Sequence, residues 1–198
     1  MNTEHTGRVS QEEPPLTVAY LETLPDDDNR YELIAGELFV SLAPGLPHQL
    51  VLQRLQLALG NYLETNPIGI IVPGAGAVFS DYDSVIPDLV FVRNEMWDKI
   101  VANDRFVAAP TLVIEVLSPG NQNRKRDLEA KRKLYERFGV EEYWIVDREN
   151  RCVQLFRLRD KKLEETAALH DSDDLKSSSL PGFAVNVSSL FVLPLRTE

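Results

Sequence analysis

The sequence predicts an α/β (α+β) domain in which helices flank a central mixed sheet. Two observations carry this prediction: apolar segments of strand length alternate with two longer segments of helical periodicity, and turn-forming residues separate them. The chain has 198 residues, 43% hydrophobic and 26% charged, which suffices for one compact domain with a sizeable core. Residues 1–13 are polar and are expected to form a disordered tail, so the single domain spans residues 14–198.

The first structured elements are expected to be a short helix and an extra N-terminal hairpin. Thr17 can cap a helix over VAYLETL, which Pro25 and the acidic turn DDDN end. The segment RYELIAGELFVS predicts two strands joined at Ala35 and Gly36, because glycine supplies the backbone freedom that a tight turn requires. The hairpin therefore precedes the rest of the sheet.

Two longer helices are predicted further along the chain. Apolar residues recur at helical intervals over residues 48–64, and Asn66 and Pro67 end this amphipathic helix. A second helix is expected at about residues 123–138, where Gly139 stands in the position favoured just past a C-terminus.

The remaining apolar segments have the length of strands. Four lie between the two helices, IGIIV, AVFSDY, IPDLVFV and TLVIEVLS, and two follow the second helix, EEYWIVD and CVQLFRL. In the last part of the chain, LEETAAL is a weaker strand candidate and HDSDDLKSSS is expected to be a polar loop. The segment LPGFAVNVSSLF can close over the edge of the domain.

Composition excludes several classes of protein and favours a cytoplasmic one. The single cysteine, Cys152, forms no intramolecular disulfide and fits packing in a reducing compartment. No apolar run approaches the roughly 20 residues needed to span a bilayer, and the polar first residues lack the apolar core of a signal peptide. We therefore expect no membrane partner.

Charge is distributed unevenly along the chain. The net charge of −10 argues against binding nucleic acid through the whole surface, yet residues 124–137 hold seven basic and three acidic side chains. Nucleic acid, if bound, is expected there, with Arg124, Lys125 and Arg132 as candidate contacts. The ordinary alternative is a solvated helix face.

Two acids occupy positions where charges are costly. Glu115 lies within TLVIEVL, a run typical of strands buried on both faces, and Asp88 follows Pro87 in VIPDLVFV. Each alone has an ordinary explanation, because acids in strands usually pair with a cation, cap a turn or face solvent. Their occurrence in two neighbouring strand segments raises the possibility of a shared site.

Lys131 strengthens that interpretation. On a helical wheel at about 100° per residue, Lys131 lies within about 10° of the apolar stripe of the second helix, whereas its basic neighbours point toward solvent. Lys131 therefore faces the sheet that carries the two acids, although a lysine there can also extend along the edge of the core. Arg124 lies near the same direction at the start of the helix.

Two carboxylates and a lysine suit the hydrolysis of phosphodiesters. Carboxylate oxygens are hard ligands for Mg²⁺, with Mn²⁺ as an alternative, and a bound metal polarises phosphate and activates water. On this hypothesis Asp88 and Glu115 bind the metal, and the Val116 carbonyl can add a ligand. Lys131 then positions the attacking water, helps to deprotonate it, or offsets the charge that develops on phosphorus.

These residues carry a family resemblance. Through YELIAGEL, PHQLVLQRL, IPDLVFV, VIEVLSPGNQNRKRDLEAKRKLYERFGVEEYWIVD and VQLFRL, the chain resembles the Uma-type restriction endonuclease family of the PD-(D/E)XK nuclease superfamily. The resemblance implies a restriction-endonuclease-like fold and a metal-dependent endonuclease acting on DNA. Because proteins of this fold often act in pairs, it also allows a homodimer.

Pro87 and Asp88 match the first motif of the superfamily, and Glu115 matches the acid of the second. The simplest pattern places lysine two residues after that acid, where this chain has Leu117. The resemblance implies instead that the lysine has moved onto the following helix, where Lys131 matches the family and coincides with the residue that the helical wheel selects.

Two further residues have alternative interpretations. His48 begins the first long helix, where an exposed capping or hydrogen-bonding role competes with catalysis. Glu32 and Glu37 alternate out of the apolar hairpin and most simply face water, although Glu32 can approach the metal as an accessory acid. The dinucleotide and phosphate-loop fingerprints are missing from the sequence.

Three hypotheses therefore compete. The leading one is a metal-dependent endonuclease, and its main rival is a catalytically inactive module that keeps the nuclease fold and binds nucleic acid or protein. A third hypothesis treats the buried charges as an ion-pair network that serves only the fold.

Overall fold

The computed structural model describes residues 14–118 and 126–192, and the side chains of residues 126 and 127 are not described. The expected tail, residues 1–13, lies outside the described residues. Within the described part, the strands form two six-stranded sheets and one small two-stranded sheet. The predicted α+β class is confirmed, but the predicted single sheet is two sheets.

The sheet that contains the longer strands is called the central sheet. In order across the sheet, it consists of β12 (Lys162–Leu169), β11 (Cys152–Arg159), β10 (Glu142–Asp147), β9 (Leu112–Val116), β6 (Leu89–Arg93) and β3 (Gly69–Pro73). Only the pair β9 and β10 is parallel among these described strands, so the sheet is mixed, as predicted.

The second sheet, called the hairpin sheet, contains the predicted N-terminal hairpin. Its order is β2 (Glu37–Leu42), β1 (Asn29–Ile34), β5 (Asp83–Val85), β4 (Ala77–Ser80), β8 (Arg105–Phe106) and β7 (Val101–Ala102). Ala35 and Gly36 both adopt positive φ in the turn of the hairpin, which explains the need for glycine. The hairpin is thus the edge of a second sheet rather than an addition to the first.

Helices of different lengths complete the fold. They are α1 (Val18–Leu21), α2 (Leu46–Thr65), the 3-10 helix η1 (Asn94–Met96), α3 (Trp97–Ile100), the π-helix η2 (Arg126–Lys131), α5 (Arg132–Phe138) and α6 (Val187–Leu190). Thr17 makes no capping hydrogen bond, and α1 is shorter than predicted. Helix α2 begins two residues earlier than predicted, because Pro47 is tolerated in a first turn.

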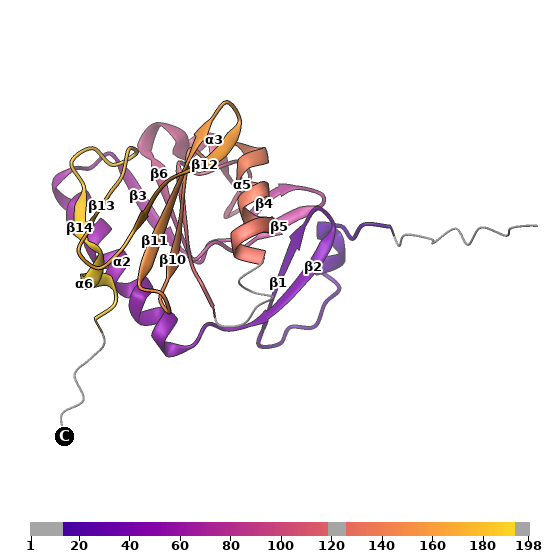
Figure 1. Cartoon of the computed structure of the whole chain (residues 1–198). Coiled ribbons are helices and arrows are strands. Elements are labelled where there is room, and N and C mark those ends of the chain that lie inside the picture. Colours follow the sequence, from indigo (N-terminus) through magenta and orange to yellow (C-terminus); the bar gives the residue numbers. More distant parts are fainter. Residues whose placement is uncertain (1–13, 119–125, 193–198) are drawn as a thin grey trace, which may run out of the picture.

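The central sheet is covered on both faces (Figure 1). One face packs against α2 and the C-terminal segment through a cluster that includes Leu55, Trp144 and Leu190. The other face packs against α5 and the hairpin sheet through a cluster that includes Val113, Tyr135 and Ile34. Helix α5 consequently lies between the two sheets, where it can contact residues from both.

The C-terminal part differs from the prediction in one respect. The segment expected to be a polar loop contains β13 (Asp174–Lys176), which pairs with β14 (Ala184–Asn186). The single buried side chain of β13, Leu175, packs into the core on the α2 side, and one apolar residue is too weak a pattern to predict a strand. None of the described helices is long and apolar enough to cross a membrane.

Candidate active site

A cavity of about 330 Å³ opens where the two sheets meet. Its lining comes from β1, β2, the beginning of α2, the link between β5 and β6, the end of β9, and the end of η2. The three side chains that the sequence singled out, Asp88, Glu115 and Lys131, all line this cavity. They come from three separate parts of the chain.

Asp88 stands where the chain passes from the hairpin sheet to the central sheet. It is 7% exposed, and its Oδ2 atom accepts hydrogen bonds from the backbone N–H of Val116 at 2.9 Å and from His48 Nε2 at 3.0 Å. Burial raises the pKa of Asp88, but the hydrogen bond and charge of His48, the charge of Lys131 and the Val116 N–H bring it below its ordinary value. The carboxylate form is therefore favoured.

Glu115 occupies the central strand β9 and pairs with Lys131. Both side chains are 2% exposed, and Lys131 Nζ lies 2.9 Å from Glu115 Oε1. The Tyr135 hydroxyl donates a second hydrogen bond to the same oxygen at 2.7 Å. The buried charge of Glu115 is thus neutralised and hydrogen bonded, as a buried acid requires.

Glu32 of β1 is the third acid of the cavity. Its position in the strand indicated that it faces water, but the side chain is buried. Its Oε1 lies 2.9 Å from Lys131 Nζ and accepts the N–H of Ile86 at 2.9 Å. That interpretation was wrong because the hairpin belongs to a second sheet, which packs against α5 and buries the face that a lone hairpin would expose. Glu37 is exposed, as predicted.

His48 is buried rather than exposed, in the first turn of α2. Its Nε2 contacts Asp88, while its Nδ1 is buried without a hydrogen-bond partner among the described residues. His48 therefore orients one oxygen of Asp88 rather than capping the helix. The other oxygen, Oδ1, accepts no hydrogen bond from the described residues, and Arg30 Nη1 is 3.8 Å away.

The local helix geometry explains how Lys131 reaches the acids. Lys131 is the last residue of the π-helical stretch η2, directly before α5. Wide π-turns are uncommon and occur often at functional sites. Because Lys131 and Tyr135 are four residues apart, they lie on one helix face, and both contact Glu115 Oε1. The sequence placed Tyr135 only in the core, although this spacing from Lys131 is a signal that could have identified it.

Of the three predicted nucleic-acid contacts, only Arg132 belongs to the described residues. Arg124 and Lys125 lie outside the described residues. Arg132 does not line the cavity, and its guanidinium lies over the ring of Phe156 in β11, 5.3 Å from the ring centre. Arg132 therefore packs against the central sheet, whereas the helical wheel predicted that it points toward solvent.

The donor set fits a hard divalent cation. Asp88, Glu115 and Glu32 supply carboxylate oxygens to one cavity whose buried cation is Lys131. Across residues 14–118 and 126–192, no three acid, histidine or cysteine side chains form a ready-made metal cage. Mg²⁺ does not require one, since it binds one or two carboxylates and keeps several waters.

Comparisons with known proteins identify the family and the fold. The family model Uma2, described as "Putative restriction endonuclease", matches residues 18–188. A solved structure described as "a putative nuclease belonging to DUF820 from Anabaena variabilis ATCC 29413" superposes with a TM-score of 0.70. The match has 19% sequence identity and covers 89% of this chain and 98% of that one, so it supports the fold alone. No curated protein matches.

Proposed function

The chain belongs to the Uma2 family, and on that premise we propose that it is a Mg²⁺-dependent nuclease, with Mn²⁺ as an alternative metal, that hydrolyses phosphodiester bonds in DNA. The observation that carries the proposal is the convergence of Asp88, Glu115 and Lys131 in one cavity. These are the types of residue that phosphodiester hydrolysis requires, and they come from separate segments.

Asp88 and Glu115 would hold the metal, and the Val116 carbonyl is a further candidate ligand. When bound, Mg²⁺ polarises a phosphate and lowers the pKa of a coordinated water. His48 and the Val116 N–H hold Asp88 Oδ2, which leaves Oδ1 as the oxygen available for a ligand. Glu115 is held by Lys131 and Tyr135 through Oε1.

Lys131 acts as a fixed positive charge in this proposal. An ammonium that contacts two carboxylate oxygens at 2.9 Å is a donor and not a base. It can donate to the attacking water or to a phosphate oxygen as negative charge develops there. The water oxygen forms a bond to phosphorus, the P–O ester bond breaks, and the proton lost by the water balances the one gained by the departing alkoxide.

The test is a cleavage assay with Mg²⁺ or Mn²⁺ on plasmid DNA and on DNA and RNA oligonucleotides of one sequence. We expect the wild type to cut DNA, and Asp88→Asn, Glu115→Gln and Lys131→Met each to lose at least about 100-fold in rate. Lys99→Met is the control, because Lys99 is exposed on α3, outside the basic segment 124–137, and does not line the cavity. Its rate should equal that of the wild type.

Thermal melts separate this proposal from its rivals. A metal site predicts that Mg²⁺ raises the melting temperature of the wild type but not of Asp88→Asn. At 100 times the dissociation constant, the metal should stabilise the folded wild type by about 2.7 kcal/mol. An inactive binding module would bind nucleic acid without cutting it. An ion-pair network would show no response to metal and a lower melting temperature in all three variants. Cleavage of RNA alone would overturn the choice of DNA.

A further inference from the structure

The two described donors to Glu115 Oε1 come from one helical face, Lys131 at the end of η2 and Tyr135 in α5. Lys131 Nζ approaches this oxygen at 2.9 Å and the Tyr135 hydroxyl at 2.7 Å. Lys131 also contacts Glu32, so its ammonium is shared between two acids. The Tyr135 hydroxyl, in contrast, makes its only described hydrogen bond to Glu115.

We propose that Tyr135 is a positioning residue, which holds the Glu115 carboxylate in the orientation that binds the metal. The inference rests on the proposed function of this cavity. Tyr135 does not line the cavity and acts only through Glu115. Outer partners of metal-binding carboxylates fix the orientation of the ligand, and their loss typically costs 10–100-fold in metal affinity or activity.

The surroundings of Tyr135 make it a rigid donor. The side chain is fully buried, and its ring lies edge-on to Phe79 and tilted against Tyr143, with ring centres 6.5 Å and 5.1 Å away. Burial first, and then the charge of Glu115, raise the pKa of the Tyr135 phenol well above its ordinary value. The hydroxyl therefore remains protonated at neutral pH and donates to the charged carboxylate.

A purely structural role is the alternative, because a buried tyrosine hydroxyl usually finds some partner. The choice of partner distinguishes the two. Glu115 Oε1 already receives the Lys131 ammonium, so satisfaction of the carboxylate does not require the phenol. A second donor on the same atom restricts rotation of the Glu115 carboxylate. This restriction matters for metal binding, because the other proposed ligand, Asp88, comes from a different segment of the chain.

Tyr135→Phe tests the proposal, because it removes only the hydroxyl and keeps the ring. Tyr143→Phe is the matched control: Tyr143 is also fully buried, packs against Tyr135, and does not line the cavity. For each protein we would measure Mn²⁺ binding by calorimetry, the Mn²⁺ dependence of DNA cleavage, and the melting temperature without metal. We expect about a 10–100-fold weaker Mn²⁺ midpoint in Tyr135→Phe and an unchanged midpoint in Tyr143→Phe.

The outcomes are distinguishable. If the wild type binds Mn²⁺ and cuts DNA while Tyr135→Phe has the same Mn²⁺ midpoint as Tyr143→Phe, the positioning role is wrong and the nuclease stands. A lower melting temperature without a change in midpoint also overturns the positioning role, since that is what a structural role predicts. If the wild type neither binds Mn²⁺ nor cuts nucleic acid, the proposed function fails and the positioning role fails with it.

Discussion

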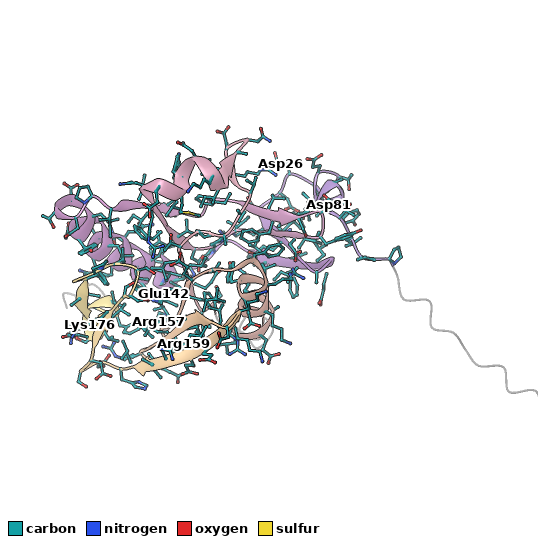
Figure 2. The ribbon with its side chains drawn as sticks, turned by 90° about the horizontal axis from the view of Figure 1, so that it is seen from above. Asp26, Asp81, Glu142, Arg157, Arg159 and Lys176 are labelled. Carbon is teal, nitrogen blue, oxygen red and sulfur yellow. The ribbon has the colours of Figure 1, made fainter. Side chains whose placement is uncertain are left out.

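Two buried glutamates on opposite faces of the central sheet have different surroundings. Glu115 lies in β9 and Glu142 in the adjacent parallel strand β10, where Glu142 pairs in register with Leu112. Both are almost completely buried. Glu115 belongs to the face covered by α5, and Glu142 to the face covered by the C-terminal segment, near Lys176 and far from Asp81 (Figure 2).

Glu142 accepts its described hydrogen bonds from neutral donors, while Arg157 lies opposite it in register on β11 and Arg93 lies within range of its charge. Its Oε1 accepts the Trp144 indole N–H at 2.8 Å, and its Oε2 accepts the hydroxyls of Ser177 and Ser178 and the backbone N–H of Ser179. Glu115 instead contacts a cation and shares a cavity with two other acids. Burial of an acid therefore does not by itself indicate a reaction site. A better indication is a cavity that the acid shares with other charged side chains.

The largest expected effect is a difference in stability between the same substitution at the two glutamates. Glu142→Gln should lower the free energy of unfolding by about 3 kcal/mol, because the amide presents hydrogens to donors that the carboxylate satisfied. Glu115→Gln should lower it by less, about 1 kcal/mol, since the amide oxygen can still accept from Tyr135 and Lys131 keeps Glu32 as its charge partner. Urea unfolding followed by fluorescence measures both.

Cleavage should respond in the opposite way. Below its melting temperature, Glu142→Gln should cut DNA at the wild-type rate, whereas Glu115→Gln should lose at least about 100-fold. Equal losses of activity in the two variants, at temperatures where both are folded, would contradict the distinction between a structural and a reactive glutamate.

The sequence predicted the Glu115 half of this comparison, namely an acid and a lysine that face each other, because single charges in apolar runs and helical spacing are local signals. Glu115 interrupts a buried strand, and the wheel places Lys131 on the apolar face of its helix; both are buried at the cavity. The hairpin, α2 and the strands of the central sheet were likewise predicted, with boundaries that differ by a few residues.

The misplaced residues are those whose surroundings come from distant segments. Glu32 and His48 were expected near water and are buried, because the second sheet and the start of α2 close over them. Glu142 is the first residue of β10, where an acid raises no suspicion, and three of its four described donors, Ser177, Ser178 and Ser179, lie 35 to 37 residues further along the chain. No local pattern reports such a pairing.

A moderate effect concerns acid stability and extends the contrast to Asp88. Its pKa is lower in the folded protein than its ordinary value of 3.8, so the folded state binds fewer protons and gains stability at higher pH. That gain is fully present above about pH 4 and is lost as the pH falls through the lower, folded-state pKa.

The measurement is the free energy of unfolding of the wild type and of Asp88→Asn from pH 7 down to pH 2. The advantage of the wild type over the variant should shrink below about pH 4, because only the wild type has this carboxylate to protonate. A constant difference across the range would mean that the charged form of Asp88 adds nothing to the fold.

The smallest expected effect tests whether the ammonium can reach Glu115 from another backbone position. Leu117 stands two residues after Glu115, so both side chains point to the same face of the strand. Glu142 provides a precedent in the same sheet, since Trp144, two residues after it, donates directly to its carboxylate. A lysine at position 117 should therefore reach Glu115 when position 131 no longer supplies the charge.

We expect Leu117→Lys to recover about tenfold of the cleavage rate that Lys131→Met loses, which corresponds to about 1.4 kcal/mol of barrier. Recovery should be incomplete, because Glu32 of the hairpin sheet contacts the ammonium of Lys131, whereas a lysine at position 117 would lack this contact. Leu117→Met in the Lys131→Met background is the control for packing. A folded double variant without recovery would mean that the reaction needs the ammonium delivered by the helix, between both acids.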